Sequence, residues 1–196
     1  MRIIGGKNKG KKIKVPKRGI RPTKGIIRGA IFNIIAENIH NAQVLDIFAG
    51  TGALGIEAIA RGAESCVFIE KNPQYLYTNI KNLCLPSAEK IGLIMTDFRP
   101  GLKKVADQQF DIIFVDPPYQ RDYIDKTLEL ISRYHLLKNQ GLIVVEHSCE
   151  TNFNLPADFI ISKKKQYGKT AVSFISKDRA HDNSPDSNDS KSRELL

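Results

Sequence analysis

From residue 43 to residue 146 the sequence alternates short apolar runs with helical patterns, and no other feature limits the possible folds as strongly. Five runs rich in Ile, Val and Phe predict buried strands at residues 43–48, 66–70, 92–95, 111–116 and 141–146. Segments with apolar residues at helical spacing lie between them, at 53–61, 73–83, 99–106 and 124–134. Because strand–helix–strand units cross over in a right-handed sense, this order predicts a doubly wound, Rossmann-like α/β fold with a mostly parallel sheet.

Three further segments complete the predicted organisation. Residues 25–38 have helical spacing, and residues 159–166 and 171–176 predict a closing antiparallel hairpin. The last segment, residues 177–196, is polar with almost nothing to bury, so we expect a disordered tail. The sequence thus divides into an arm at 1–24, a domain at 25–176 and this tail.

The net charge of +9 is concentrated at the start of the chain. Residues 1–36 contain eleven Lys or Arg and no acid, whereas a solvated protein face normally mixes both signs. The pattern predicts an arm, partly a hairpin of 2–4 with 11–15, that binds the phosphates of a nucleic acid. The candidate contacts are Arg2, Lys7, Lys9, Lys11, Lys12, Arg18, Arg21 and Arg28.

Composition argues against several other classes of protein. No apolar run approaches the roughly 18 residues that a membrane span needs, and the first residues lack the apolar core of a secretory signal. Cys66, Cys84 and Cys149 are far apart and have no metal-like spacing, so we expect reduced thiols in a cytoplasmic protein and no metal site. A monomer is the simplest expectation.

A glycine-rich turn follows the first predicted strand and predicts a cofactor site. Gly50, Gly52 and Gly55 spell G-x-G-x-x-G, which would suit a dinucleotide, and Glu70 ends the next strand where it could bind ribose hydroxyls. Asp46, however, would repel a pyrophosphate at this turn, whereas it favours a sulfonium and an ammonium. The residues therefore favour S-adenosyl-L-methionine over NAD.

The third predicted strand ends at the same crevice and adds two candidate cofactor contacts. Asp97 could accept a hydrogen bond from an adenine amino group, although it could also serve only as a helix cap. The backbone N–H of Phe98 could face a ring nitrogen, and Phe48 borders the glycine turn.

The fourth predicted strand ends in Asp116, Pro117, Pro118 and Tyr119, which predict the catalytic site. Two prolines remove N–H donors, so carbonyl oxygens and the Asp116 carboxylate form an acceptor-rich surface beside an aromatic ring. That surface suits a planar base that stacks on Tyr119. Hydrogen-bond acceptors for both protons of the base's amino group would localise the lone pair on its nitrogen. They would also aim that lone pair at the methyl group of S-adenosyl-L-methionine. The base must first be flipped out of its stack.

These paired motifs resemble the amino-methyltransferases of nucleic acids, and the chain as a whole resembles the bacterial family that methylates N2 of a guanine in 16S ribosomal RNA. The resemblance covers residues 1 to about 176 and rests on residues 2–7, 21–23, 28–33, 45–58 and 61–63 together with Glu70 and 116–119. It implies a seven-stranded class I methyltransferase fold, a small-subunit substrate, and the roles given to Asp46, Glu70, Asp97 and Asp116. The family usually has an Asp-Arg pair and an Arg-Glu pair where this chain has Gly25-Ile26 and Arg28-Gly29.

Two alternatives remain open at this point. A DNA adenine or cytosine amino-methyltransferase could use the same Asp-Pro-Pro-Tyr motif, although we expect such an enzyme to carry a separate target-recognition region. A non-catalytic RNA-binding assembly factor could retain the fold without the activity.

Overall fold

The computed structural model describes residues 1–16, 22–83, 90–118 and 122–178. Its helical elements are α1 (Pro22–Ile34), η1 (Ala36–Asn38), α2 (Ala53–Ala60), α3 (Gln74–Asn82), α4 (Phe98–Lys103) and α5 (Asp122–Arg133). Its strands are β1 (Gln43–Ile47), β2 (Ser65–Ile69), β3 (Ile91–Ile94), β4 (Phe110–Val115), β5 (Leu137–Ser148), β6 (Phe159–Tyr167) and β7 (Thr170–Lys177). The predicted disordered tail falls almost entirely outside the described residues.

The strands form one seven-stranded sheet in the order β3-β2-β1-β4-β5-β7-β6. The first five strands are parallel, whereas β7 pairs antiparallel with β5 and with β6. The doubly wound sheet and the C-terminal antiparallel hairpin are thus confirmed. The order reverses between β1 and β4, and such a switch point opens a crevice at the carboxyl ends of the strands.

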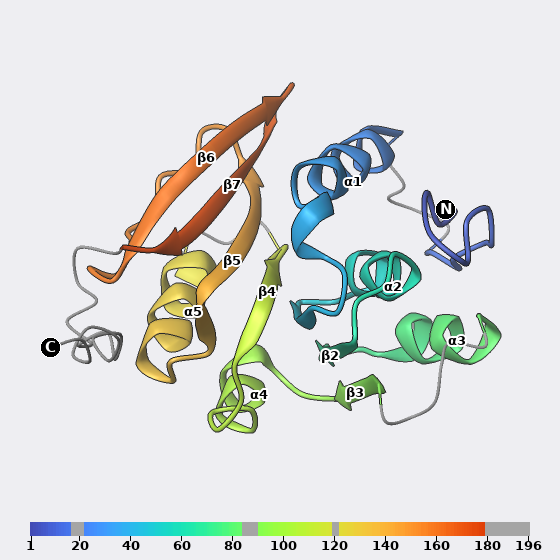
Figure 1. Ribbon diagram of the computed structural model, residues 1–196, viewed down its shortest axis with the longest axis horizontal. Helices are drawn as coiled ribbons and strands as arrows, with labels where there is room; N and C mark the ends of the chain where they lie inside the picture. The colour runs from blue at the N-terminus through green and yellow to red at the C-terminus, as the bar shows by residue number, and fades with distance from the viewer. Residues whose placement is uncertain (17–21, 84–89, 119–121, 179–196) are drawn as a thin grey trace, which may run out of the picture.

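Alternate residues of the central strands supply two separate cores. Val44 and Ile112 belong to the core beneath α1, α2 and α3, whereas their neighbours Leu45 and Ile113 belong to the core beneath α4 and α5. Figure 1 shows these two groups of helices on opposite faces of the sheet. Because side chains alternate along a strand, apolar runs without polar interruption can fill both cores at once.

The first residues form the predicted hairpin, and it is docked on the domain. Ile3 donates to Lys11, Ile13 donates to Met1, and the side chains of Ile3 and Ile13 are 2% exposed. The hairpin lies beside α2 and α3 (Figure 1). Its basic residues therefore project from an ordered platform.

Two elements begin several residues earlier than expected. Helix α1 begins at Pro22 rather than at residue 25, as proline is well tolerated in a first helical turn. Strand β5 begins at Leu137 rather than at 141, and a register shift in its pairing with β4 accommodates the extra residues.

In the part of the chain described, no helix has the length and apolar character that crossing a membrane requires.

Candidate active site

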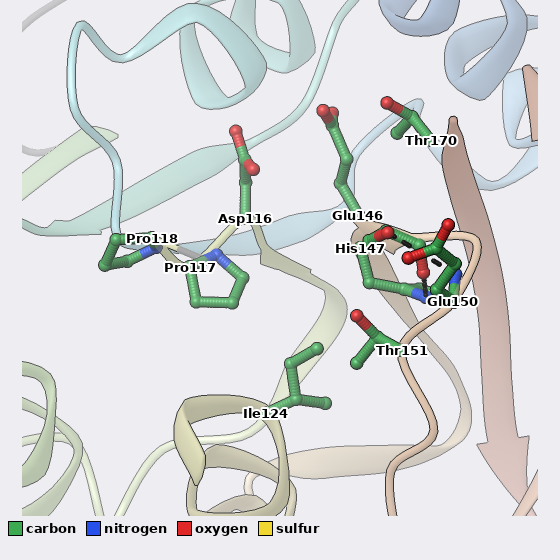
Figure 2. A pocket seen from close by; sticks show the side chains of 10 residues that line it. Asp116, Pro117, Pro118, Ile124, Glu146, His147, Glu150, Thr151 and Thr170 are labelled. Atoms are coloured by element: carbon green, nitrogen blue, oxygen red, sulfur yellow. Dashed lines mark hydrogen bonds between the residues drawn. The ribbon is translucent and has the colours of Figure 1, made fainter. Parts of the chain in front are cut away.

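Two cavities meet at the carboxyl end of β4. One, of about 330 Å³, is lined by residues that follow β1, β2 and β3 and by Tyr123 of α5. The other, of about 200 Å³, is lined by the end of β5 and the start of β7 (Figure 2). Asp116 and Pro118 line both cavities. We call the first the glycine-loop cavity and the second the strand-end cavity.

The glycine turn between β1 and α2 needs glycine for two separate reasons. Gly50 and Gly52 have φ values of 56° and 77°, a region that side chains strongly disfavour. At Gly55 an added Cβ would collide with Phe68 on β2, so helix α2 can pack against the sheet only without a side chain there. Phe48 also has a positive φ of 62°, an unusual conformation for a bulky residue that is often found at functional sites.

Asp46 lies beneath the turn and is 1% exposed. Its carboxylate accepts a hydrogen bond from the backbone N–H of Gly55 at 2.9 Å, which ties β1 to the start of α2. Burial raises the pKa of Asp46 to about 7, and the charges of Asp116 and Glu70 act in the same direction, while the Gly55 hydrogen bond opposes them. Asp46 is thus positioned to order the turn from below, with a carboxyl that can change charge near neutral pH.

Glu70 follows β2 and lines the glycine-loop cavity. Its two carboxylate oxygens accept hydrogen bonds from the backbone N–H groups of Gly50 and Asn72, each at 2.7 Å. These contacts fix the carboxylate of Glu70 beside the glycine turn, where it can accept hydrogen bonds from a ligand's hydroxyl groups.

An aromatic cluster lines the same cavity. The rings of Phe48 and Tyr123 are stacked with centroids 5.8 Å apart, and Phe98 contacts both at 4.9 and 5.3 Å. The guanidinium of Arg99 lies over the ring of Phe98 at 4.6 Å. Flat apolar walls of this kind suit the face of a planar ring.

Asp97 both caps a helix and lines the glycine-loop cavity. Its side chain accepts a hydrogen bond from the backbone N–H of Arg99 at 3.2 Å, as expected for the first residue before α4. Asp97 therefore caps α4, and it also lies in the wall of the glycine-loop cavity, where a ligand could contact it.

The strand-end cavity is lined by the three residues that directly follow β4, Asp116, Pro117 and Pro118. Tyr119, the fourth predicted catalytic residue, lies outside the described residues. Figure 2 shows the Asp116 carboxylate on the same side as that of Glu146, which comes from β5. The predicted acceptor-rich surface thus includes a second acid.

His147 lines the strand-end cavity and is buried, with 4% of its surface exposed. Its Nδ1 lies 2.8 Å from the Ser148 carbonyl, so it carries the proton, and Nε2 lies 2.9 Å from the Ser173 hydroxyl. Burial lowers the pKa of His147, while its bond to Ser148 opposes the shift and Lys164 reinforces it. A neutral ring that accepts from Ser173 fits these contacts.

The predicted RNA contacts divide into three groups. Arg2, Lys7, Lys9, Lys11 and Lys12 are exposed on the docked hairpin. Arg18 and Arg21 lie outside the described residues.

Arg28 differs, because it is only 4% exposed and points inward. Its guanidinium donates to the Arg2 carbonyl at 2.5 Å and lies 3.7 Å from the Glu57 carboxylate. The prediction that Arg28 contacts RNA is therefore corrected: its charge is used inside the protein to anchor the hairpin.

Sequence reasoning missed four residues. Three of them line the site, and the fourth supports it from outside. Glu146, His147 and Tyr123 line the cavities, and Glu57 anchors the hairpin. For Glu146 and His147 the available signal was their position after a buried strand, where the ends of parallel strands meet. For Tyr123 it was the nearness of the Asp-Pro-Pro turn in the sequence.

Comparison with known proteins identifies a family that spans nearly the whole described chain. The profile of the family described as Conserved hypothetical protein 95 matches residues 1–176. Ribosomal RNA small subunit methyltransferase D of Escherichia coli strain K12 is 35% identical over 173 residues, which make up 87% of this chain and 87% of that protein.

Solved structures agree with this assignment. The Escherichia coli protein yhhF has a TM-score of 0.80 at 34% identity, covering 90% of this chain and 97% of that chain. The Thermus thermophilus protein TTHA0928 has a TM-score of 0.76 at 27% identity, covering 90% and 99% of the two chains.

Proposed function

The chain belongs to the family described as Conserved hypothetical protein 95 and is related to ribosomal RNA small subunit methyltransferase D, and we propose the specific reaction that it catalyses. The protein transfers a methyl group from S-adenosylmethionine to the exocyclic N2 of a guanine in 16S ribosomal RNA. The observation that carries the proposal is that Asp116 and Pro118 line two cavities at once, so a donor on one side can face a base on the other.

The glycine-loop cavity suits a cationic donor in its electrostatics. Of the described residues that line it, Glu70, Asp97 and Asp116 carry carboxylates and Lys71 an ammonium, and Arg99 pairs with Asp97 at 3.4 Å. A pyrophosphate would be repelled by this lining, whereas a sulfonium is attracted, which favours S-adenosylmethionine over NAD. Glu70 would hold the ribose hydroxyls, and the wall of Phe48 and Phe98 would hold the adenine.

The reaction then depends on how the base is presented. Bound S-adenosylmethionine supplies an electrophilic methyl group on sulfur. The Asp116 carboxylate and the Pro117 carbonyl accept the two amino protons of the base, which keeps the nitrogen lone pair out of the ring and directed at that methyl. As positive charge develops on nitrogen, the same acceptors stabilise it, and one amino proton then leaves through the Asp116 carboxylate to water. Transfer is direct and in line, and positioning supplies much of the rate enhancement.

A transfer assay with labelled donor tests this proposal. Small ribosomal subunits, bare 16S rRNA and duplex DNA are offered in parallel, and the labelled nucleoside is identified by mass spectrometry. We expect label in N2-methylguanosine from the small subunit or its rRNA. Label in DNA alone would instead support the amino-methyltransferase of DNA, and donor binding without transfer to any substrate would support a non-catalytic assembly factor.

The raised pKa of Asp46 predicts that donor affinity depends on pH. A cationic donor binds best when Asp46 is ionised, and with a pKa of about 7 that carboxyl is mostly protonated at pH 6. Affinity for S-adenosylmethionine should therefore rise about tenfold between pH 6 and pH 8, with proton release on binding. Calorimetry at both pH values measures it. In Asp46→Asn the dependence should flatten; an equally steep profile in that variant would assign the titration to another group.

The exposed lysines of the hairpin should set the salt dependence of RNA binding. Replacing Lys9, Lys11 and Lys12 with alanine should weaken binding of 16S rRNA and lower the slope of log affinity against log salt by about 2 to 3. A control with Lys103, Lys104 and Lys126 replaced removes the same charge from exposed positions on α4, its C-terminal end and α5. Equal slopes in the two triple variants, measured by filter binding, would give the hairpin some other role.

The proposal includes a cytoplasmic location, where the small ribosomal subunit or its assembly intermediate is the partner, and a monomeric enzyme. The division into an RNA-binding arm, a catalytic domain and a disordered tail is part of the same proposal.

A further inference from the structure

We propose that Glu146 makes the site specific for guanine, by accepting the ring N1–H that lies next to the amino group held by Asp116. The inference rests on the proposed function, since it assigns a second contact to the same flipped base. It separates guanine from the other amino-bearing bases, which the Asp-Pro-Pro motif alone does not do.

The sheet register places the two acids side by side. Val115 of β4 is the pairing partner of Val145 of β5, and the next residues along these parallel strands are Asp116 and Glu146. Both line the strand-end cavity, and Figure 2 shows their carboxylates on the same side of it. Two acceptors from adjacent strand ends match a base edge that presents adjacent donors.

The neighbour of Glu146 fixes the direction of its side chain. His147 is turned toward β7, where its ring contacts the Ser173 hydroxyl at 2.9 Å and packs edge-on against Phe153. Because successive side chains of a strand point to opposite faces, the anchored His147 holds Glu146 on the face that Asp116 occupies. This accounts for a buried His147 without an acid–base role.

The pattern of hydrogen-bond donors on each base decides which base the two acceptors, Asp116 and Glu146, can bind. In guanine the N2 amino group has N1–H, a donor, beside it. In adenine the amino group stands beside N1, and in cytosine beside N3, and both of these ring nitrogens are acceptors. A carboxylate at that point therefore accepts from guanine and repels the lone pair of the other two. Sites that hydrogen-bond a substrate donor reject analogues lacking it strongly, because a buried polar group is left unpaired.

Glu150 is the other acid of this cavity and serves as the control. It lies in the turn that follows β5, it is exposed, and Figure 2 shows it on the side of His147 rather than of Asp116. Position alone thus singles out Glu146.

The test uses small subunits reconstituted with rRNA in which the methylated guanine is replaced by 2-aminopurine. This base keeps the 2-amino group, but its N1 is an acceptor. Wild-type enzyme should prefer guanine by about 100-fold or more in kcat/KM. In Glu146→Gln the side-chain amide can donate to N1 of 2-aminopurine, so the preference should fall below about tenfold. Glu150→Gln should keep the wild-type preference. Loss of the guanine O6 is common to all variants and cancels between them.

The outcomes separate the two claims. If wild-type enzyme makes no N2-methylguanosine, the proposed function fails and this inference with it. If it does, but Glu146→Gln keeps the wild-type preference, only the assignment of Glu146 is overturned. Should the amide variant be too slow to measure, Glu146→Ala decides: without the carboxylate the preference should fall below about tenfold, and a preference as large as that of the wild type would overturn the assignment.

Discussion

Replacing Asp116 with alanine is expected to lower kcat by about 10³-fold while S-adenosylmethionine still binds nearly as well as to the wild type. The variant loses the acceptor that localises the amino lone pair and stabilises charge in the transition state, an interaction that the donor alone does not need. Glu70, Asp97 and the aromatic wall remain in place on the donor side. Single-turnover methylation of small subunits and calorimetry with the donor measure the two effects separately.

Two further variants define what Asp116 contributes. Asp116→Asn keeps the shape but offers one acceptor and two donors, so it should also lose most activity if acceptance of the amino proton is essential. Asp122→Ala removes an exposed acid nearby at the start of α5 and should leave kcat unchanged. Retention of wild-type turnover in Asp116→Ala would remove this residue from the mechanism.

Replacing Glu57 with alanine is expected to destabilise the protein by about 3–5 kcal/mol. Glu57 is fully buried, and its carboxylate accepts from the backbone N–H groups of Ile4 and Gly5 and from Arg61. It also faces the buried guanidinium of Arg28, whose pKa is lowered mainly by burial. Alanine would leave that guanidinium without its compensating charge and two backbone donors without acceptors.

Denaturant unfolding measures this loss, and hydrogen exchange at Ile4 and Gly5 shows whether the hairpin detaches. The exposed Glu64 gives a matched control, for which Glu64→Ala should change stability by less than about 0.5 kcal/mol. The double variant Glu57→Ala with Arg28→Met should recover part of the loss, because no unpaired buried charge remains. Additive losses in the double variant would mean that the two charges do not interact.

The sequence was sufficient for the centre of the sheet because β1 and β4 are buried along nearly their whole length and so appear as largely apolar runs. The site could be anticipated for a similar reason: the glycine turn and the Asp-Pro-Pro turn each follow such a run, and ends of parallel strands share one edge. Gly52 and Gly55 could be assigned to the turn from sequence, although the contact of Gly55 with Phe68 depends on how α2 packs.

The errors came from contacts between distant parts of the chain. Arg28 was assigned to RNA because no acid lies near it in sequence, but its partner Glu57 is on another helix and reaches it only after folding. Tyr123 gives no local signal of its place in the site, because its ring stacks on Phe48, which follows β1 and is distant in sequence. His147 has no partner near it in sequence, and Ser173 becomes its partner only through the pairing of β5 with β7.

A crystal structure of the protein with S-adenosylhomocysteine tests the central claim most directly, because that claim is a matter of position. The account predicts the ribose hydroxyls on Glu70, the adenine between Asp97 and the Phe98 ring, and the sulfur facing Asp116, which lines both cavities. Homocysteine sulfur turned away from Asp116, or the whole ligand seated outside the glycine-loop cavity, would contradict it.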